Sequence, residues 1–270
     1  MLFRSFGYDI FTAHAIKVTR DAELDIDNDI STSFIQKIEK GLKNRKRGKP
    51  TRLVFDKEIP NALLKYLINK LGLSNKDNLI PGGRIHNFKD FMNFPEVVFK
   101  QISQRKKPFT HPALQNTKSV TKVILDKDVM LHFPYHSFNS IIDLLRESAI
   151  NPDVISIKIT CYRLAAYSKV INSLINASRN GKQVTVVIEL RARFDEEANL
   201  IWKKELEEAG VKVLIGMPRM KVHAKLCLIK KRVNNTTTHY GFVSTGNLNE
   251  KTASLYGDHC LLTSNRSIMA

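Results

Sequence analysis

Residues 154–190 read VISIKITCYRLAAYSKVINSLINASRNGKQVTVVIEL, and this stretch contains the clearest secondary-structure pattern of the chain. Val154 to Ile159 is rich in β-branched apolar residues, as in a buried strand, and Val184 to Leu190 has the same character. Between them, Ser168 to Asn180 carries apolar residues at helical spacing, and the following Gly181 is typical of a helix end. A strand, a helix and a second strand in this order predict two parallel strands joined by a helix.

The same alternation continues on both sides of this stretch. We predict helices at Ser137 to Ala149 and Glu196 to Ala209, and strands at Val211 to Ile215 and Val222 to Ile229. The pattern favours an α/β domain over residues 109–270, with a mostly parallel or mixed sheet flanked by helices. In such sheets, functional side chains gather just beyond the ends of the strands.

The first part of the chain, residues 1–108, predicts a separate α+β unit. A polar and basic connector at residues 104–120, which contains Pro108 and Pro112, separates it from the α/β domain. The predicted elements of this unit are strands at Ala15 to Thr19 and Arg52 to Asp56, and helices at Thr32 to Leu42 and Pro60 to Leu71.

The composition narrows the class of partner. The 270 residues carry a formal net charge of +17, which attracts anions such as nucleic acid, anionic lipid or a polyphosphate chain. Charge alone does not separate these partners. Because no apolar run is long enough to span a bilayer and the first residues lack a secretory signal, we expect a cytoplasmic location.

The cysteines Cys161, Cys227 and Cys260 form no C-x-x-C pair, and two of them lie in apolar runs. We therefore expect reduced and mostly buried thiols. The sequence contains no cluster of His or carboxylate residues near these cysteines at the spacing of zinc ligands, so it does not predict a zinc site.

The sharpest chemical feature is the triplet His223-Ala224-Lys225. On a strand at Val222 to Ile229, His223 and Lys225 would lie two residues apart and face the same side. An imidazole beside an ammonium suits attack on a phosphoryl group, because the lysine disfavours protonation of the imidazole and balances phosphoryl charge. Such triplets are common on protein surfaces, so the triplet alone does not establish a site.

Other candidates lie in a nearby loop and at strand ends. The backbone N–H groups of the loop Val243 to Asn249, together with Asn247, could bind a phosphate, although the same residues also favour a plain turn. Arg163 and Arg193 each follow a predicted strand, where a guanidinium could bind phosphate oxygens. Either arginine could instead pair with a nearby acidic residue, such as Glu189, Asp195 or Glu196.

At many separate points the sequence resembles the bacterial polyphosphate kinases that work through a phosphohistidine. The triplet with the Asn247 loop also resembles half the signature of the phospholipase D superfamily. The pieces that match the kinases' first catalytic domain run from Asp128 to Thr263 and include residues 133–138, 162–163, 180–187, 192–199, 223–226, 245–253 and 255–256. The pieces that match the kinases' head domain are residues 19–23, 60–63 and 81–91.

The resemblance implies that His223 is phosphorylated by ATP and passes the phosphoryl group reversibly to a growing polyphosphate chain. It also implies that Arg163 and Arg193 lie at the phosphate site together with Mg²⁺, and that Tyr256 contacts the nucleotide. Because arginine has no lone pair to offer a metal, we expect both arginines to bind the phosphates that Mg²⁺ also binds. We add two residues to these candidate site residues: Lys225 because of its position on the predicted strand, and Asn247 because its loop could bind a phosphate.

Members of this family are longer than 270 residues. The resemblance implies an N-terminal domain and a second phospholipase D-like domain, so we interpret the chain as a fragment. It would hold part of the head domain, residues 1–108, and the first phospholipase D-like catalytic domain, residues 109–270. The implied partners are ATP or ADP and inorganic polyphosphate, with no need for nucleic acid. A homo-oligomer and peripheral membrane association of the full-length enzyme stay open.

Two alternatives to the kinase remain. A phospholipase D-like hydrolase would use His223 on a phosphodiester of a lipid or a nucleic acid, although the head-domain resemblance argues against it. The isolated chain could also bind polyanions without turnover, because it holds half of a two-part active site. We expect the chain by itself to be inactive or weakly active.

Overall fold

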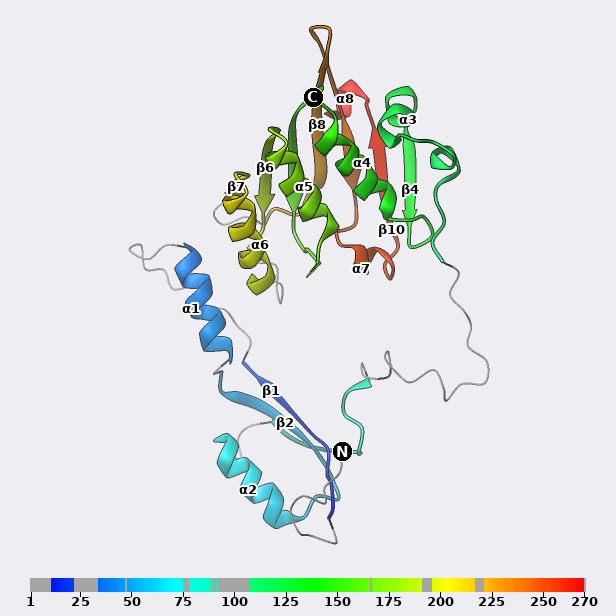
Figure 1. Cartoon of the computed structure of the whole chain (residues 1–270). Coiled ribbons are helices and arrows are strands. Elements are labelled where there is room, and N and C mark those ends of the chain that lie inside the picture. Colours follow the sequence, from blue (N-terminus) through cyan, green and yellow to red (C-terminus); the bar gives the residue numbers. More distant parts are fainter. Residues whose placement is uncertain are drawn as a thin grey trace. The chain divides into compact units, whose positions relative to one another are not determined.

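The computed structural model describes residues 11–21, 34–46, 48–74, 78–88, 91, 107–165, 167–190, 196–216 and 221–269. The chain divides into two compact units, Met1–Gln104 and Arg105–Ala270. Each unit is a separate body with its own sheet (Figure 1).

The described part of the first unit contains a three-stranded sheet in the order β1-β2-β3. β1 (Ile16–Arg20) pairs antiparallel with β2 (Pro50–Asp56), and β2 pairs parallel with β3 (Asn78–Gly82). Helix α1 (Phe34–Lys46) follows β1, and α2 (Asn61–Leu71) connects the two parallel strands. The predicted strands and helices of this unit are confirmed over the described residues, which exclude residues 32 and 33 of the first predicted helix.

The second unit is built on a mixed sheet, which has seven strands over the described residues in the order β4-β10-β9-β8-β5-β6-β7. Among these strands, β5, β6 and β7 pair parallel, and every other neighbouring pair is antiparallel. The strands are β4 (Val129–Phe133), β5 (Val154–Cys161), β6 (Gln183–Ile188), β7 (Lys212–Ile215), β8 (Lys225–Val233), β9 (Thr236–Ser244) and β10 (Asp258–Thr263).

The antiparallel half of this sheet comes from connections that the sequence pattern did not reveal. Asn234 and Asn235 have left-handed φ values of 46° and 60°, which allow a tight turn between β8 and β9. β9 then leads through α7 (Glu250–Ala253) to β10, which pairs with both β9 and β4. The predicted mixed α/β sheet is therefore confirmed, and a mostly parallel sheet is wrong.

Helices α4 (Asn139–Ile150) and α5 (Lys169–Arg179) pack against each other and against the sheet (Figure 1). The side-chain oxygen of Ser168 accepts the N–H of Ile171 at the start of α5, and Gly181 follows its end with a φ of 79°, as the sequence predicts. The other helices are α3 (Val120–Asp126), α6 (Glu196–Glu208) and α8 (Arg266–Met269). Within the described ranges, no helix combines the length and apolar character needed to cross a membrane.

The predicted connector at residues 104–120 is wrong over most of its length. Residues 104–106 lie outside the described residues, but the rest is folded into the second unit. Phe109 donates its N–H to the carbonyl of Tyr135 at 2.9 Å, and its own carbonyl accepts the N–H of Ser137 at 2.8 Å. Leu114, at the end of the short 3-10 helix Pro112–Leu114, is 5% exposed. Prolines and basic residues suggested a linker, but backbone pairing and one buried leucine anchor the segment.

All three cysteines are free and buried inside the second unit, as predicted. Burial raises the pKa of Cys161 and of Cys260 to about 12. It also raises the pKa of Cys227, and the two other thiols add to this effect. The thiols are therefore protonated and shielded from solvent at neutral pH.

We expect these thiols to resist alkylation while the domain is folded. At pH 8 about one thiol in ten thousand is ionised if its pKa is about 12, and the thiolate is the reactive form. A chromogenic thiol reagent should label the native chain very slowly and label all three cysteines in guanidinium chloride. Rapid labelling of the native chain would contradict this burial.

Candidate active site

Several candidate residues come together at one edge of the mixed sheet, namely the edge that is formed by strand ends and not by an outer strand. The parallel strands β5 and β6 end at this edge, and β8 begins here because it runs antiparallel to β5. β9 ends and β10 begins at the same edge, since Ser244 pairs with Lys225 on one side and with Cys260 on the other. Figure 1 shows α7 below the strands at this edge. Residues far apart in the sequence thus meet where the parallel strands end.

His223 lies at this edge, but it does not lie on a strand. β8 starts at Lys225 rather than at Val222, so residues 221–224 have no regular secondary structure. His223 is exposed, whereas Lys225 is only 4% exposed. The prediction that the two residues share one face of a strand is therefore wrong.

Side chains, rather than a neighbouring strand, hold the backbone around His223. The N–H of the residue before it donates to the carboxylate of Glu189 at 2.9 Å. The carbonyl of His223 accepts from the ammonium of Lys225 at 2.6 Å, and the carbonyl of Ala224 accepts from the hydroxyl of Thr160 at 2.7 Å. Because Glu189 is 2% exposed and Thr160 is 9% exposed, water competes little for these bonds.

The ring of Tyr162, just beyond β5, is the side chain around which the candidates gather. The imidazole of His223 meets it edge-on, with the two ring centroids 5.3 Å apart. The ammonium nitrogen of Lys225 lies 5.4 Å from the ring centroid, and the guanidinium carbon of Arg163 lies 5.9 Å from it. Since the face of an aromatic ring attracts cations, Tyr162 helps to hold positive charge next to His223.

Lys225 is a buried cation in an environment that opposes its charge. Burial lowers the pKa of its ammonium, and the carboxylate of Asp258 at the start of β10 partly raises it again. The carbonyl of His223 takes up one of its N–H donors. A phosphate bound beside Lys225 would favour the charged form further.

The loop after β9, which contains Asn247, packs closely against the carboxylate of Asp258. Thr245 donates its hydroxyl to Asp258 at 2.8 Å. A Cβ on Gly246 would lie 2.5 Å from the carboxyl carbon of Asp258, so this position has room only for glycine. The side-chain oxygen of Asn247 is buried and has no hydrogen-bond partner among the described residues. Such atoms are rare in folded proteins, so Asn247 stays a candidate for ligand binding.

Asn199 on α6 ties two strand ends together. It is fully buried, and its side-chain amide donates to the carbonyls of Tyr162 and Glu189, each at 2.9 Å. The residues that follow β5 and β6 and contact the His223 segment are thereby fixed to the same helix.

The remaining predicted residues have different outcomes. Arg163 is half-buried at the edge of the sheet, beside Tyr162. Arg193 lies outside the described residues. Tyr256 lies between α7 and β10 and is 63% exposed. The structure thus gathers His223, Lys225 and Arg163 around one ring and leaves Tyr256 at the surface.

Sequence reasoning missed several residues that shape the site. Asn199 could have been found, because it is a polar residue on the apolar side of a predicted helix. Glu189 was considered only as a partner for arginine. The roles of Thr160, Tyr162 and Asp258 depend on which strands lie side by side, and the sequence pattern does not provide that order.

The described residues form no metal site of their own. No group of three or more His, Cys, Asp or Glu side chains among them could hold a metal ion. Arg163 and Arg193 do not fit as magnesium ligands, because a guanidinium has no lone pair for a metal.

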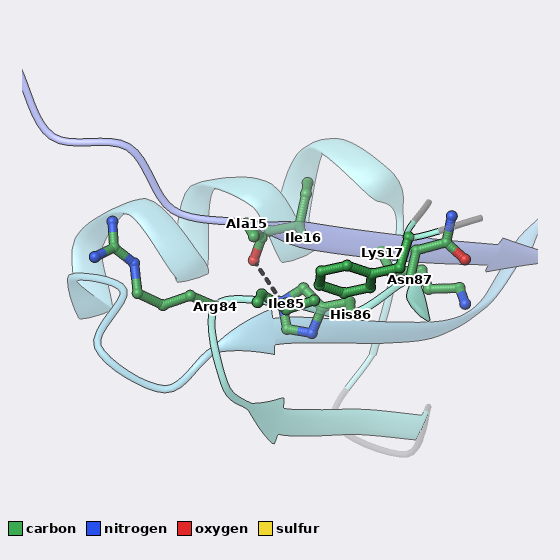
Figure 2. Close-up of a pocket in the computed structure, with 8 residues that line it drawn as sticks. Ala15, Ile16, Lys17, Arg84, Ile85, His86 and Asn87 are labelled. Carbon is green, nitrogen blue, oxygen red and sulfur yellow. Dashed lines mark hydrogen bonds between the residues drawn. The ribbon is translucent and has the colours of Figure 1, made fainter. Parts of the chain in front are cut away.

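The first unit has a separate open pocket of about 570 Å³ (Figure 2). Arg84 lies at one end of this pocket, Lys17 and Asn87 lie at the other, and His86 lies between them. The Nε2 atom of His86 forms a hydrogen bond with the carbonyl oxygen of Ala15 at 2.9 Å, which ties the segment after β3 to the residue before β1. This pocket lies in the first unit, whereas all predicted site residues belong to the second unit.

Two family models match the chain. The model described as "Polyphosphate kinase middle domain" matches residues 1–94, and "Polyphosphate kinase C-terminal domain 1" matches residues 119–270. The chain belongs to the polyphosphate kinase family.

Curated polyphosphate kinases are similar to the chain over nearly its whole length. The polyphosphate kinase of Vibrio cholerae is 44% identical over 271 residues, which cover 100% of this chain and 39% of the relative. That of Escherichia coli K12 is 44% identical over 269 residues, which cover 97% of this chain and 39% of the relative.

A solved structure supports the same relationship. The crystal structure of polyphosphate kinase from Porphyromonas gingivalis matches 97% of this chain and 37% of its own chain, with a TM-score of 0.72 and 31% sequence identity. The chain thus spans about two fifths of the length of the curated polyphosphate kinases that it matches.

In this polyphosphate kinase domain, Gly246→Ala should destabilise the loop that holds Asn247. The added Cβ would collide with Asp258, and we expect the free energy of unfolding to fall by about 1–3 kcal/mol. Gly257→Ala is the matched control, because nothing lies within 4 Å of its added Cβ. Urea unfolding of both variants measures the difference, and equal stabilities would contradict the close contact with Asp258.

Proposed function

We propose that this chain carries the phosphoryl-accepting part of a polyphosphate kinase, with His223 as the residue that ATP phosphorylates. The observation that supports this most directly is the exposed imidazole of His223, which lies against Tyr162 beside the cations of Lys225 and Arg163. Membership of the polyphosphate kinase family supports the choice of reaction.

The proposed reaction consists of two phosphoryl transfers. A ring nitrogen of His223 attacks the terminal phosphorus of ATP, so that an N–P bond forms, the bond to the bridging oxygen breaks, and ADP leaves. A terminal oxygen of polyphosphate then attacks the same phosphorus, and the imidazole leaves with the electron pair of the N–P bond. The polyphosphate chain grows by one phosphate, and both transfers can run in reverse.

The cations beside His223 suit the charge of these transfers. Lys225 and Arg163 would contact the oxygens of the transferring phosphoryl group, where positive charge lowers the barrier. Lys225 has three N–H donors, so it can bind a phosphate and keep its bond to the His223 carbonyl.

More distant groups would hold the rest of the substrates. Arg193 and Asn247 would bind further phosphates, and the exposed ring of Tyr256 would contact the nucleotide. Mg²⁺, carried by the nucleotide phosphates, would offset part of their charge.

A phospholipase D-like hydrolase would use the same His223 on a phosphodiester of a lipid or nucleic acid. The match of residues 1–94 to the polyphosphate kinase middle domain favours the kinase. Assays for nuclease and lipase activity in the presence of excess ATP distinguish the two reactions.

Homo-oligomer formation, peripheral membrane association and a cytoplasmic location stay predictions from the sequence and the family resemblance.

His223→Ala should abolish the acid-labile, alkali-stable phosphate that the complete gene product containing this chain takes up from ATP. The variant removes the attacking nitrogen and leaves the rest of the site in place. Labelling with γ-³²P-ATP and Mg²⁺ measures the loss. His239→Ala is the control, because His239 lies on β9 opposite Lys230, away from the site edge. Undiminished label in the His223 variant would refute His223 as the acceptor.

The isolated chain, with its net charge of +17, should bind long-chain polyphosphate without turning it over. Because exposed charge contacts are screened by salt, we expect affinity to fall by about tenfold or more between 50 and 200 mM salt. Fluorescence anisotropy with labelled polyphosphate measures this, and an unlabelled neutral polymer should not compete. Affinity that is independent of salt would contradict binding through net charge.

A further inference from the structure

The hydroxyl of Thr160 takes over from backbone pairing at the point where β5 and β8 separate. The last paired residues of this antiparallel ladder are Ile159 and Cys227. One position further on, the hydroxyl oxygen of Thr160 accepts the N–H of Leu226 at 3.0 Å and donates to the carbonyl of Ala224 at 2.7 Å. A side chain therefore continues the ladder into the segment that carries His223.

A hydroxyl is the smallest side-chain group that can both donate and accept at this position. Its two backbone partners lie on either side of Lys225, and Thr160 itself is 9% exposed. Removing the hydroxyl would leave the N–H of Leu226 and the carbonyl of Ala224 without these bonds in a part-buried place. Folded proteins rarely tolerate such unpaired groups, so the segment would shift to satisfy them.

The end of β5 holds His223 at two points. Thr160 lies within β5, and Tyr162 lies just beyond its end, after the buried Cys161. Thr160 holds the backbone next to His223, and Tyr162 lies against its ring at 5.3 Å. On the other side of His223, Glu189 accepts the N–H of Val222 at 2.9 Å.

We propose that Thr160 is a positioning residue for His223, which sets the direction of the imidazole without touching the substrate. The proposal rests on the proposed role of His223 as the phosphoryl acceptor. It concerns the transfer step rather than the binding of ATP, because Thr160 is buried and bonds the backbone beside the proposed attacking group. A misplacement of about 1 Å at a reacting group can slow a reaction about a hundredfold.

The kinetic test compares Thr160→Val with Thr160→Ser in the complete gene product that contains this chain. Valine keeps the shape of threonine and removes the hydroxyl, so kcat should fall about 10- to 100-fold while the KM for ATP changes by less than about twofold. Serine keeps the hydroxyl and should restore most of kcat. If the valine variant does not fold, Thr160→Ala, which removes the hydroxyl and adds no bulk, is compared with serine instead.

A spectroscopic test uses the 270-residue chain and needs no activity. The ring current of Tyr162 should displace the carbon-bound proton signals of His223 in the NMR spectrum, and the spectrum of His223→Ala identifies those signals. We expect the displacement to be lost in the valine variant and kept in the serine variant. The same comparison reports on positioning whether or not the chain transfers phosphate.

The two tests separate this proposal from the proposed function. Unchanged kcat or unchanged His223 signals in the valine variant would overturn the role of Thr160, even where His223→Ala abolishes labelling. If label persists in His223→Ala, the acceptor role fails, and the NMR comparison still decides whether Thr160 holds the ring.

Discussion

β8 runs antiparallel to β5 and lies between β5 and β9, and the geometry of the site depends on this placement. In a fully parallel sheet the start of β8 would lie at the opposite edge from the end of β5. The reversal brings His223, just before β8, next to Thr160 and Tyr162 at the end of β5. β6, which runs parallel to β5, and β9, which runs antiparallel to β8, end at the same edge, so that Glu189 and the Asn247 loop lie near the His223 segment.

The buried ammonium of Lys225 links this geometry to the electrostatics of the site. Moving a cation out of water is unfavourable unless other groups compensate it. Here the carbonyl of His223, the ring of Tyr162 and the carboxylate of Asp258 share that role. Lys225 therefore stabilises the His223 segment before any substrate arrives. The ammonium has three N–H donors, one of which bonds the carbonyl of His223, so a phosphate contact would let one side chain serve both the fold and the proposed chemistry.

Strong local patterns explain which parts of the fold the sequence could predict. The stretch from Val154 to Leu190 has long apolar runs and clear helix ends, such as the Ser168 cap and Gly181. β9 was missed although it follows β8 through the tight turn at Asn234 and Asn235. β4 and β10 were missed, because their pairing joins segments far apart in the chain. A local pattern contains no information on such partners, so the order of the strands could not be deduced.

The sequence indicated residues that the structure brings together around Tyr162, but it did not indicate the residues that hold them in place. His223, Lys225 and Arg163 could be chosen from their chemistry and their places near strand ends. The start of β8 was wrong because Val222 continues the apolar run, whereas bonds from Glu189 and Thr160 set the boundary. Those bonds join different secondary-structure elements. They set the conformation of the segment before β8, where the local sequence does not favour one conformation over another.

The bonds that hold the His223 segment join residues far apart in the chain. Thr160 is separated by 64 and 66 positions from its two partners, and Glu189 by 33 from Val222. Contacts of this range form only once β5, β6 and β8 have assembled, since loop closure over such lengths is entropically unfavourable. A nascent or partly unfolded domain therefore presents His223 as an undirected imidazole. The position of the His223 side chain is thus established together with the fold of the sheet.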